Sequence, residues 1–345
     1  MDINQHNDIF ELLHNTWGIA PRKVIQINEG SADCFVIETV SDKYFLKIYQ
    51  EKFDRESLKN EVALCGFLLE KGFSVSHFLR SLNGMYVEIY DNRFCILQKY
   101  IYGITFHKFE VSKSELIDSV KVLAKLNIAL EELPFQLPVG FTPEWYTEWS
   151  VDCEIEKYKK LLAKLDVNDI YYNRIAADFK AKSRLIERFN PTEFDFSHLT
   201  YANTHGDYNV LQLIFENSKV KSVIDFSSCA RLPICWEIIR SYTLSSTECR
   251  YGIIDQDNFI AYVQAYMEIK RLTRNDLGLM PYFYLFTLLR STFGYKTYIE
   301  KKNHSICVDS KDLATLEFAF WRTSMCNWLY QNAEHLSLQL ISIVE

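Results

Sequence analysis

Apolar and polar positions divide the chain into an N-terminal part of mixed pattern and a longer part of mainly helical pattern. Apolar residues at helical spacing predict helices over residues 8–17 and 55–71. Around these helices, short runs of β-branched and aromatic residues alternate with turn residues, which is typical of antiparallel strands. The predicted strands cover residues 24–27, 34–39, 44–49, 85–90 and 94–100.

After residue 100 most apolar positions recur at helical spacing. The predicted helical segments cover residues 114–132, 151–189, 234–246, 255–270, 275–300 and 310–340. The exception is a pair of short apolar runs on either side of Ser218-Lys219. Two such runs around a short polar segment predict a hairpin with Ser218-Lys219 at its tip.

Composition sets broad limits on the class of protein. A chain of 345 residues is long enough for two domains, and its net charge of −7 argues against nucleic acid as the main partner. Its nine cysteines form no Cys-x-x-Cys pair and no zinc spacing, which favours reduced thiols in a cytoplasmic protein. The first residues lack a signal-peptide pattern, and the apolar run 279–289 is too short to span a bilayer. We therefore expect a cytoplasmic protein without a membrane partner.

The strongest chemical signal is a pair of aspartates around the predicted hairpin. His205-Gly206-Asp207 precedes its first strand, and Val223-Ile224-Asp225 ends its second strand. Because a hairpin returns the chain to its starting end, both carboxylates are expected at the same end of it. Phosphoryl transfer from a nucleotide uses such a pair, one carboxylate for the proton of the attacking hydroxyl and one for magnesium. The pattern therefore indicates a phosphotransferase site.

These motifs resemble the signature of the aminoglycoside phosphotransferase and spore-coat-kinase-like family, which runs His-Gly-Asp, a short loop, Asn, apolar residues and Ile-Asp. The resemblance implies an α+β, two-lobed protein-kinase-like fold. Its small lobe, antiparallel strands plus one helix over residues 1–102, would bind the nucleotide. Its large, mainly helical lobe over residues 103–345 would carry catalysis and substrate binding. The implied activity is an ATP- and Mg²⁺-dependent transfer to a small-molecule hydroxyl, with GTP as the alternative nucleotide.

By this resemblance, Asp207 is the catalytic base and Asp225 the main magnesium ligand. The family has an asparagine five residues after the catalytic aspartate, where this chain has Gln212. A glutamine carbonyl can still bind magnesium, and Asn209 has the expected side chain at the wrong spacing, so Gln212 is the predicted second metal ligand. His205 is expected to shape the loop by hydrogen bonds to local backbone.

The resemblance also assigns residues to phosphate binding. Lys47, on the third predicted strand, is expected to bind the phosphates and to pair with Glu61 on the helix that follows. Glu56 on the same helix is a competitor for Glu61. The loop that contains Gly30 and Ser31 is expected to cover the phosphates, because glycine permits close backbone approach.

Backbone groups of the segment from Gln98 to Tyr100 are expected to contact the nucleobase. Glu237, which follows Pro233, is expected to stabilise the catalytic region from a helix start, where the helix dipole favours an acidic residue.

The acceptor is less well defined by the sequence. Acidic residues 144, 148 and 152 have the spacing of one helix face and lie among aromatics, which would suit a cationic amine. A solvated helix surface is the alternative reading of such a row. Further candidate pocket residues are Tyr282, Arg290, Tyr295 and Trp321.

Three functions are compatible with these residues. A small-molecule kinase is favoured, and the family's acceptors suggest an aminoglycoside-like antibiotic, an amino alcohol such as choline, or homoserine. A catalytically weak nucleotide-binding or scaffold protein is the alternative, motivated by Gln212 and by a phosphate loop with one glycine. Protein phosphorylation fits less well, because the chain has no Asp-Phe-Gly or Ala-Pro-Glu segment. The oligomeric state is left open.

Overall fold

The computed structural model describes residues 7–27, 32–51 and 53–344. Its contacts divide the chain into two compact units. Unit 1 runs as far as Thr105 and also contains residues 132–135 and 212–229, and unit 2 contains residues 106–131, 136–211 and 230–345. The domain boundary after residue 102 stays a prediction. By its contacts, the segment from Gln212 to Cys229, which follows the Asp207 motif, belongs to unit 1.

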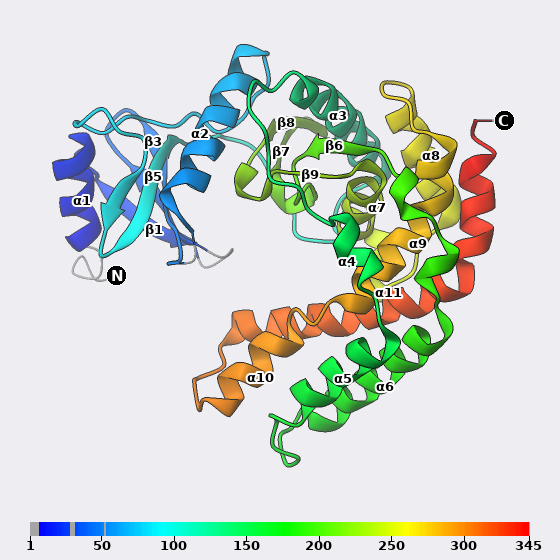
Figure 1. Ribbon diagram of the computed structural model, residues 1–345. Helices are drawn as coiled ribbons and strands as arrows, with labels where there is room; N and C mark the ends of the chain where they lie inside the picture. Colours follow the sequence, from blue (N-terminus) through cyan, green and yellow to red (C-terminus); the bar gives the residue numbers. More distant parts are fainter. Residues whose placement is uncertain (1–6, 28–31, 52, 345) are drawn as a thin grey trace. The chain divides into compact units, whose positions relative to one another are not determined.

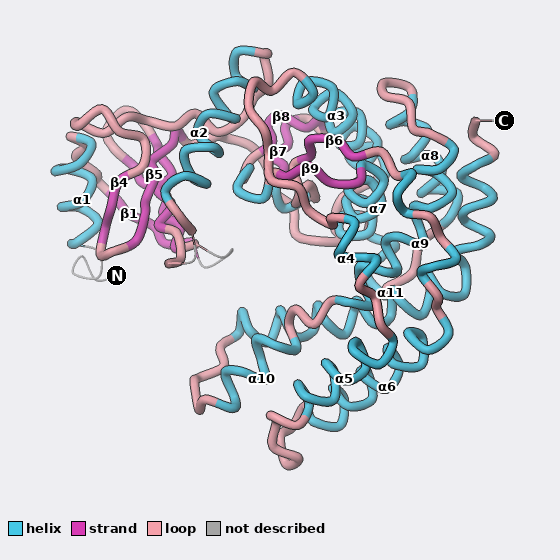
Figure 2. The backbone as a smooth tube through the Cα atoms, viewed as in Figure 1, coloured by secondary structure: helices cyan, strands magenta, loops and turns pink. Residues whose placement is uncertain are grey.

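Unit 1 is built on a five-stranded antiparallel sheet of strand order β1-β2-β3-β5-β4 (Figures 1 and 2). The sheet confirms the antiparallel strands expected from the short apolar runs. Its elements, with the two helices of the unit, are α1 (Asn7–Trp17), β1 (Lys23–Ile27), β2 (Asp33–Glu38), β3 (Lys43–Ile48), α2 (Arg55–Glu70), β4 (Glu88–Tyr90) and β5 (Arg93–Lys99).

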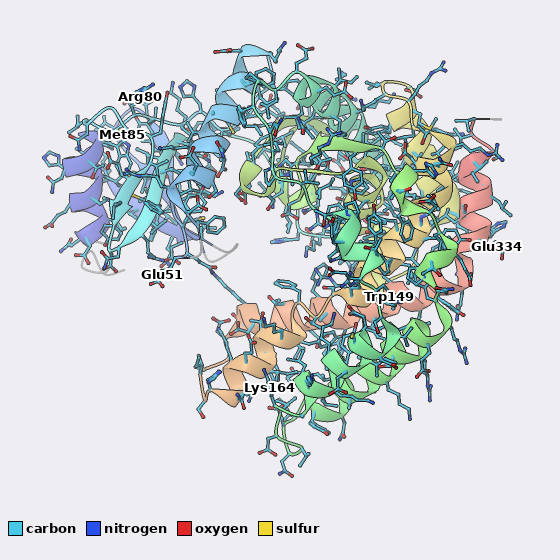
Figure 3. All side chains as sticks on the ribbon, viewed as in Figure 1. Glu51, Arg80, Met85, Trp149, Lys164 and Glu334 are labelled. Carbon is cyan, nitrogen blue, oxygen red and sulfur yellow. The ribbon has the colours of Figure 1, made fainter. Side chains whose placement is uncertain are left out.

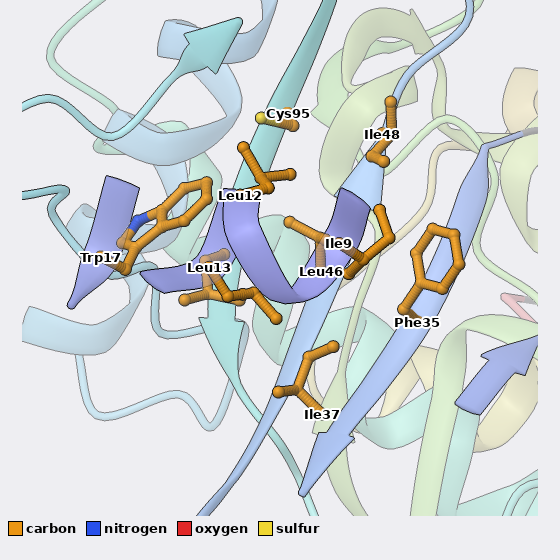
Figure 4. Packing of buried hydrophobic residues seen from close by; sticks show 10 residues of the cluster. Ile9, Leu12, Leu13, Trp17, Phe35, Ile37, Leu46, Ile48 and Cys95 are labelled. Atoms are coloured by element: carbon orange, nitrogen blue, oxygen red, sulfur yellow. The ribbon is translucent and has the colours of Figure 1, made fainter. Parts of the chain in front are cut away.

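Helix α1 covers one part of this sheet with its apolar face. Ile9, Leu12, Leu13 and Trp17, all buried, recur at helical spacing and pack against buried side chains of β2, β3 and β5 (Figure 4). The sheet side of this cluster consists of Phe35, Ile37, Leu46, Ile48, Cys95 and Leu97. Each fully buried side chain of this size contributes roughly 1.5–3 kcal/mol, so the cluster fixes β3, the strand that carries Lys47.

A hairpin of β7 (Leu213–Glu216) and β8 (Lys219–Val223) completes unit 1. Its tip is Asn217-Ser218, with φ of 51° and 57°, whereas Lys219 pairs with Glu216. The predicted tip, Ser218-Lys219, was therefore wrong by one residue. Two successive residues of positive φ are the requirement of a type I′ turn, and asparagine at its first position meets it. Val223 forms a parallel bridge with Val75, which ties the hairpin to the rest of the unit.

Unit 2 is mainly helical and contains one two-stranded sheet, β6 paired with β9 in antiparallel register. Helix α9 packs against α11 and α7, and α3 packs against α8. Figure 3 draws the side chains and labels Trp149. The ring centre of Trp149 lies 5.0 Å from that of Phe286 on α9. The elements are α3 (Lys113–Glu131), α4 (Pro143–Thr147), α5 (Val151–Leu162), α6 (Tyr172–Arg188), β6 (Tyr201–Thr204), β9 (Ala230–Pro233), α7 (Ile234–Ser245), α8 (Gln256–Met267), α9 (Arg274–Arg290), α10 (Tyr295–Asn303) and α11 (Ser310–Ile341).

Two segments that the sequence predicts as continuous helices are each split in the structure. Residues 151–189 form α5 and α6, separated by a turn in which Asp166 and Asp169 accept the backbone N–H groups of Asn168 and Tyr171 at 2.9 Å each. Short acidic side chains that bond to nearby backbone favour turns over helix. Residues 275–300 form α9 and α10, separated at Gly294, where φ is +91°.

The architecture is α+β, with the sheet in unit 1 and most of the helix in unit 2 (Figure 2). This confirms the predicted fold class. None of the helices in the described part of the chain combines the length and the apolar character that a membrane crossing requires.

Gly294 provides a test of close packing in unit 2. A Cβ at this position would lie 2.4 Å from the Thr315 carbonyl oxygen and 2.8 Å from the Ala319 Cβ, both on α11, and the positive φ disfavours any side chain. We expect Gly294→Ala to lower the free energy of unfolding by about 2 kcal/mol or more, measured by thermal or urea unfolding.

The matched control is Gly66→Ala within α2, where a Cβ would meet nothing within 4 Å. Alanine there is expected to raise stability by about 0.5–1 kcal/mol, because glycine is the weaker helix former. Equal effects of the two substitutions would contradict the packing argument.

Candidate active site

Unit 1 contains an ion pair between Lys47 and Asp225, residues 178 positions apart in the chain. The Lys47 Nζ lies 2.8 Å from the Asp225 Oδ1, and the lysine side chain is only 12% exposed. Burial opposes the charge of Lys47, but the carboxylates of Asp225 and Glu61 outweigh burial and raise the pKa of Lys47 above its usual value. The lysine is therefore held as a cation at the carboxylate that ends the hairpin.

Glu61 lies beside this pair but is bonded to a different group. It is buried on α2 and accepts a hydrogen bond of 2.9 Å from the Tyr49 hydroxyl, while burial and the charge of Asp225 raise its pKa. The Lys47 Nζ lies 5.4 Å from the centre of the Tyr49 ring. The expected partner of Lys47 was Glu61, whereas the hydrogen-bonded partner in the structure is Asp225. Glu56, the competitor, is exposed and pairs with Lys59.

Asp225 occupies a strained backbone position. Its φ of 63° and ψ of 65° place it in the left-handed region, between β8 and the 3-10 turn η5 (Phe226–Ser228). Such a conformation costs on the order of 1–3 kcal/mol in a residue other than glycine, and it persists only where the surroundings enforce it. Helix α2 packs against η5, and the Ser227 hydroxyl donates to the Asp225 Oδ1 at 2.9 Å. These contacts hold the Asp225 carboxylate in position although its backbone conformation is unfavourable.

The hairpin brings Gln212 close to Asp225 in unit 1. The Ile224 N–H donates to the Gln212 carbonyl at 2.9 Å, directly beyond the last strand pair of the hairpin. The Asn209 amide is committed to its own loop, since it donates to the Asp207 carbonyl at 2.6 Å and accepts from the Leu211 N–H at 3.0 Å. The Asn209 side chain is therefore used within its own loop, and Gln212 as the second metal ligand stays a prediction. A carboxylate and an amide oxygen are hard donors that suit Mg²⁺ together with nucleotide phosphates.

Within the described residues, no group of three or more His, Cys, Asp or Glu side chains could hold a metal ion by itself. A magnesium ion that is shared with nucleotide phosphates does not need such a group, because one or two protein ligands are enough. The two predicted ligands, Asp225 and Gln212, would be enough for a magnesium ion of this kind.

Four other residues were predicted to contact the nucleotide, and the structure describes two of them. Gly30 and Ser31 lie outside the described residues. Gln98 is buried in β5, where it pairs with Phe45 of β3. The Tyr100 N–H donates to the Lys43 carbonyl at 3.1 Å, so this donor is used inside unit 1. Contact of the segment from Gln98 to Tyr100 with a nucleobase stays a prediction.

Unit 2 contains the Asp207 motif, at the turn that follows β6. His205 is fully buried, and its Nδ1 accepts the Asp207 N–H at 3.3 Å. Gly206 has a φ of +77°, which allows the chain to reverse there, and its N–H donates to the Glu237 carboxylate at 2.6 Å. The Tyr208 hydroxyl donates to the Ser119 carbonyl at 2.8 Å. These contacts support a loop-shaping role for His205.

Arg240, which the sequence analysis missed, forms an ion pair with the Asp207 carboxylate. It lies on α7, one turn after Glu237, and its guanidinium carbon is 5.3 Å from the Trp236 ring centre. Its Nη1 is buried and has no hydrogen-bond partner among the described residues. No sequence signal connects Arg240 with Asp207, because the two lie 33 positions apart on different elements.

A cavity of about 360 Å³ lies against Arg240 in unit 2. Its walls include the aromatic rings of Phe141, Trp145, Trp236 and Phe318 and the basic side chains of Lys157, Arg240, Arg290 and Arg322. Because Arg240 contacts both the cavity and Asp207, the cavity adjoins the predicted base. Its volume is typical of sites for small metabolites.

Of the predicted pocket residues, Arg290 lines this cavity. Tyr282 stacks on Phe194, the Tyr295 hydroxyl donates to the Ala319 carbonyl, and the Trp321 Nε1 donates to the Cys249 carbonyl, so these three support packing. The acidic residues 144, 148 and 152 are exposed. They do not share one helix, because α4 ends at Thr147 and α5 begins at Val151. The predicted single acidic helix face was therefore wrong.

An antiparallel sheet with one helix after its third strand, a helical second unit and the two aspartate motifs define a protein-kinase-like phosphotransferase. The chain belongs to the phosphotransferase enzyme family, whose family model matches residues 23–267. This confirms the predicted family and the class of enzyme, a phosphotransferase.

Solved structures share this fold at low sequence identity. A spectinomycin phosphotransferase in complex with ADP and spectinomycin superposes with a TM-score of 0.60 at 14% identity, over 98% of this chain and 100% of that chain. An amicoumacin kinase in complex with AMP-PNP, Ca²⁺ and Ami has a TM-score of 0.62 at 12% identity, over 96% of this chain and 93% of that chain. A choline kinase from Streptococcus pneumoniae has a TM-score of 0.55 at 13% identity, over 92% and 97%. No curated protein matches the chain by sequence.

The buried Glu237 gives the Asp207 loop a defined pH dependence. Burial raises the pKa of Glu237 to about 7, although hydrogen bonds from Gly206 and Asn127 act in the opposite direction. The unfolded chain therefore loses this proton at lower pH than the folded protein, and stability falls as the pH rises from about 4.5 to 7. The expected loss over that range is about 3 kcal/mol, because each pKa unit corresponds to about 1.36 kcal/mol.

Glu237→Gln keeps an acceptor for the Gly206 N–H and removes the titration, so its unfolding free energy should not show this fall. Unfolding in urea at several pH values measures the difference between the two proteins. Glu187→Gln, an exposed position on α6, is the control and should follow the wild type. Identical pH profiles for the wild type and Glu237→Gln would contradict the assignment.

Proposed function

We propose that the protein transfers the γ-phosphate of ATP, with Mg²⁺, to a hydroxyl group of a small molecule. The observation that carries this proposal is the Lys47–Asp225 ion pair at a strained, left-handed aspartate. A buried lysine and a strained carboxylate are costly for stability alone, and both are useful where phosphates and magnesium must be positioned. The family to which the chain belongs supports the same class of reaction.

The chain has a candidate residue for phosphate binding, for magnesium binding and for accepting the proton of the hydroxyl. Lys47 would bind the nucleotide phosphates, and Asp225 and Gln212 would hold Mg²⁺, which neutralises phosphate charge when it is bound. Asp207 would accept the proton of the acceptor hydroxyl as its oxygen forms a bond to the γ-phosphorus. The bond between that phosphorus and the β,γ-bridging oxygen breaks, and ADP leaves. Arg240, bonded to Asp207, would hold this carboxylate in place.

In this proposal residues 1–102 form the nucleotide-binding lobe and residues 103–345 the catalytic and substrate-binding lobe. ADP and AMP-PNP in the similar structures support an adenine nucleotide, and Ca²⁺ in one of them supports a divalent cation. GTP remains the alternative nucleotide. Six of the nine cysteines are buried and the sequence has no Cys-x-x-Cys pair, which supports a reducing compartment such as the cytoplasm.

The similar structures include a spectinomycin phosphotransferase, an amicoumacin kinase and a choline kinase, which supports a hydroxylated small molecule as the acceptor class. An aminoglycoside-like compound, an amino alcohol and a homoserine-like compound all meet this description. The acidic row offered a cationic acceptor as one of two readings, but that row does not line the cavity beside Arg240. The charge of the acceptor is therefore treated separately below.

A nucleotide-binding protein without efficient transfer is the second candidate. Two observations favour it: Gln212 replaces the family's asparagine, and the Asp207 carboxylate is engaged with Arg240. Both observations concern catalysis rather than nucleotide binding, so the two candidates differ in turnover and agree on ATP binding.

Magnesium-dependent ATP binding should depend on Asp225. We expect Asp225→Asn to weaken binding by about 10- to 100-fold in the presence of Mg²⁺, because loss of a charge-assisted contact costs roughly 1.5–3 kcal/mol. Calorimetric titration with and without Mg²⁺ measures the change. Glu56→Gln, an exposed carboxylate on α2, should bind as the wild type does. Absence of ATP binding by the wild type would reject both candidate functions.

Turnover should depend on Asp207. With an acceptor found by screening hydroxylated metabolites for ADP release, Asp207→Asn is expected to lower kcat by about 10²- to 10⁴-fold, the usual contribution of a general base. Its affinity for Mg²⁺ and ATP should stay unchanged, because Asp207 is not assigned to the nucleotide. Undiminished transfer by Asp207→Asn would refute its role as base. ATP binding without any transfer would support the second candidate.

A further inference from the structure

The cavity beside Asp207 has an unusual balance of charge. Four of its lining residues, Lys157, Arg240, Arg290 and Arg322, are basic, and the described lining contains no carboxylate. Most ligand sites are apolar with a few polar groups, so this number of cations in about 360 Å³ needs an explanation.

The carboxylates that surround the cavity neutralise part of this charge. Glu154 is buried and bonds to both Arg290, at 3.0 Å, and Lys157, so one acid serves two basic groups. Asp207 pairs with Arg240. Within the described residues, Arg322 has no ion pair with a carboxylate, and its Nη1 donates to the Ser291 hydroxyl at 3.0 Å. Two acids thus face four bases, which leaves the wall positively charged.

A further cation lies behind this wall. The Lys108 Nζ is 3.7 Å from the centre of the Phe318 ring, and the Arg322 guanidinium carbon is 4.4 Å from the same ring centre. Burial and the charges of Arg240 and Arg322 together lower the pKa of Lys108 to about 8, although the charge of Asp207 acts in the opposite direction. These basic groups therefore repel one another and lack sufficient compensating charge.

The aromatic walls are already used by the chain's own cations. Arg240 lies 5.3 Å from the ring centre of Trp236, and Arg290 lies 4.4 Å from that of Trp145. Phe318 contacts both Lys108 and Arg322. An amine ligand would normally bind to such rings by cation–π contact. Here it would compete with resident cations and meet like charge.

The Arg240 guanidinium lines the cavity and has one nitrogen without a hydrogen-bond partner among the described residues. One nitrogen, Nη2, bonds to Asp207, while Nη1 is buried without a partner among the described residues. A buried unsatisfied donor costs roughly 1–3 kcal/mol, which a ligand oxygen would recover. The planar fork of arginine suits carboxylate and phosphate groups. An oxyanion bound to Arg240 would lie next to the predicted base.

We infer that this cavity binds an acceptor that carries an anionic oxygen group, a carboxylate or a phosphate ester, as well as the hydroxyl that is phosphorylated. The inference rests on the proposed function, because it names the acceptor class of the same reaction. Arg240 and Arg322 bind the oxyanion, and Lys108 adds positive charge behind them. The acceptor is thus a hydroxy acid or a phosphorylated alcohol rather than an amine.

The test compares small ligands of different charge on the full-length protein. Thermal unfolding is measured with sodium phosphate, sodium glycerate and ethanolamine hydrochloride, each at the same ionic strength, with sodium chloride as the reference. Phosphate, glycerate or both are expected to raise the unfolding temperature of the wild type in a saturable manner, and ethanolamine is not. A larger effect of glycerate identifies a carboxylate as the oxyanion, and a larger effect of phosphate identifies a phosphate ester.

Substitutions locate the effect. Arg322→Gln is expected to weaken the apparent anion affinity about tenfold or more, whereas Arg322→Lys retains part of it. Arg271→Gln, an exposed arginine between α8 and α9, removes the same charge and should behave as the wild type. Phosphate can also bind at Lys47, so Lys47→Met serves to separate the two sites and should keep the Arg322-dependent effect.

The outcomes distinguish this inference from the proposed function. Mg²⁺-dependent ATP binding, measured on the wild type and on the Arg322 and Arg271 variants, shows whether each is folded and whether the nucleotide assignment holds. For Lys47→Met, which is expected to lose ATP binding, a cooperative thermal transition shows that it is folded. ATP binding without stabilisation by either anion, or an anion effect unchanged in Arg322→Gln, overturns the anionic acceptor and leaves the proposed function intact. Stabilisation by ethanolamine equal to that by the anions overturns it as well. Arg322-dependent anion binding without ATP binding rejects the proposed function instead.

Discussion

The ion pair between Lys47 and Asp225 is the constraint around which unit 1 is organised. Its two members come from distant parts of the chain, and each needs its own support. The apolar contacts of α1 fix β3 and thus Lys47, while the turn at Asn217-Ser218 and the packing of α2 on η5 fix Asp225. A charge pair with low exposure is a weak source of stability, because desolvation offsets much of the attraction. The pair instead fixes the positions of the Lys47 ammonium and the Asp225 carboxylate relative to each other.

In unit 2 the Asp207 carboxylate is held in place by contacts with helix α7. Its acidic motif lies in a turn without regular secondary structure, and a buried carboxylate, Glu237, holds that turn through the Gly206 N–H. The adjacent turn of α7 then supplies Arg240 to Asp207. Helix α7 thus provides two residues for the Asp207 loop. Glu237 holds the loop backbone, and Arg240 is bonded to the Asp207 carboxylate.

The sequence predicted features whose cause is local. The apolar spacing of α1, the short apolar runs of β2 and β3, and the signature around Asp207 and Asp225 each carry their signal in consecutive residues. The breaks at residues 163–171 and near Gly294 were missed, because helical periodicity continues through them while Asp side chains and a positive φ end the helices. Arg240, Arg322 and Lys108 were missed for another reason. Their grouping depends on how α7, α11 and the segment after Thr105 pack, which no single stretch of sequence encodes.

The stacking of resident cations on the cavity's aromatic rings has a consequence for how its specificity can evolve. Replacement of one basic residue by a neutral one leaves the other cations in place, and a cationic ligand still meets repulsion. Replacement of an aromatic residue exposes the cation that it covered. A cavity of this kind would therefore reach the opposite charge preference only through several substitutions together.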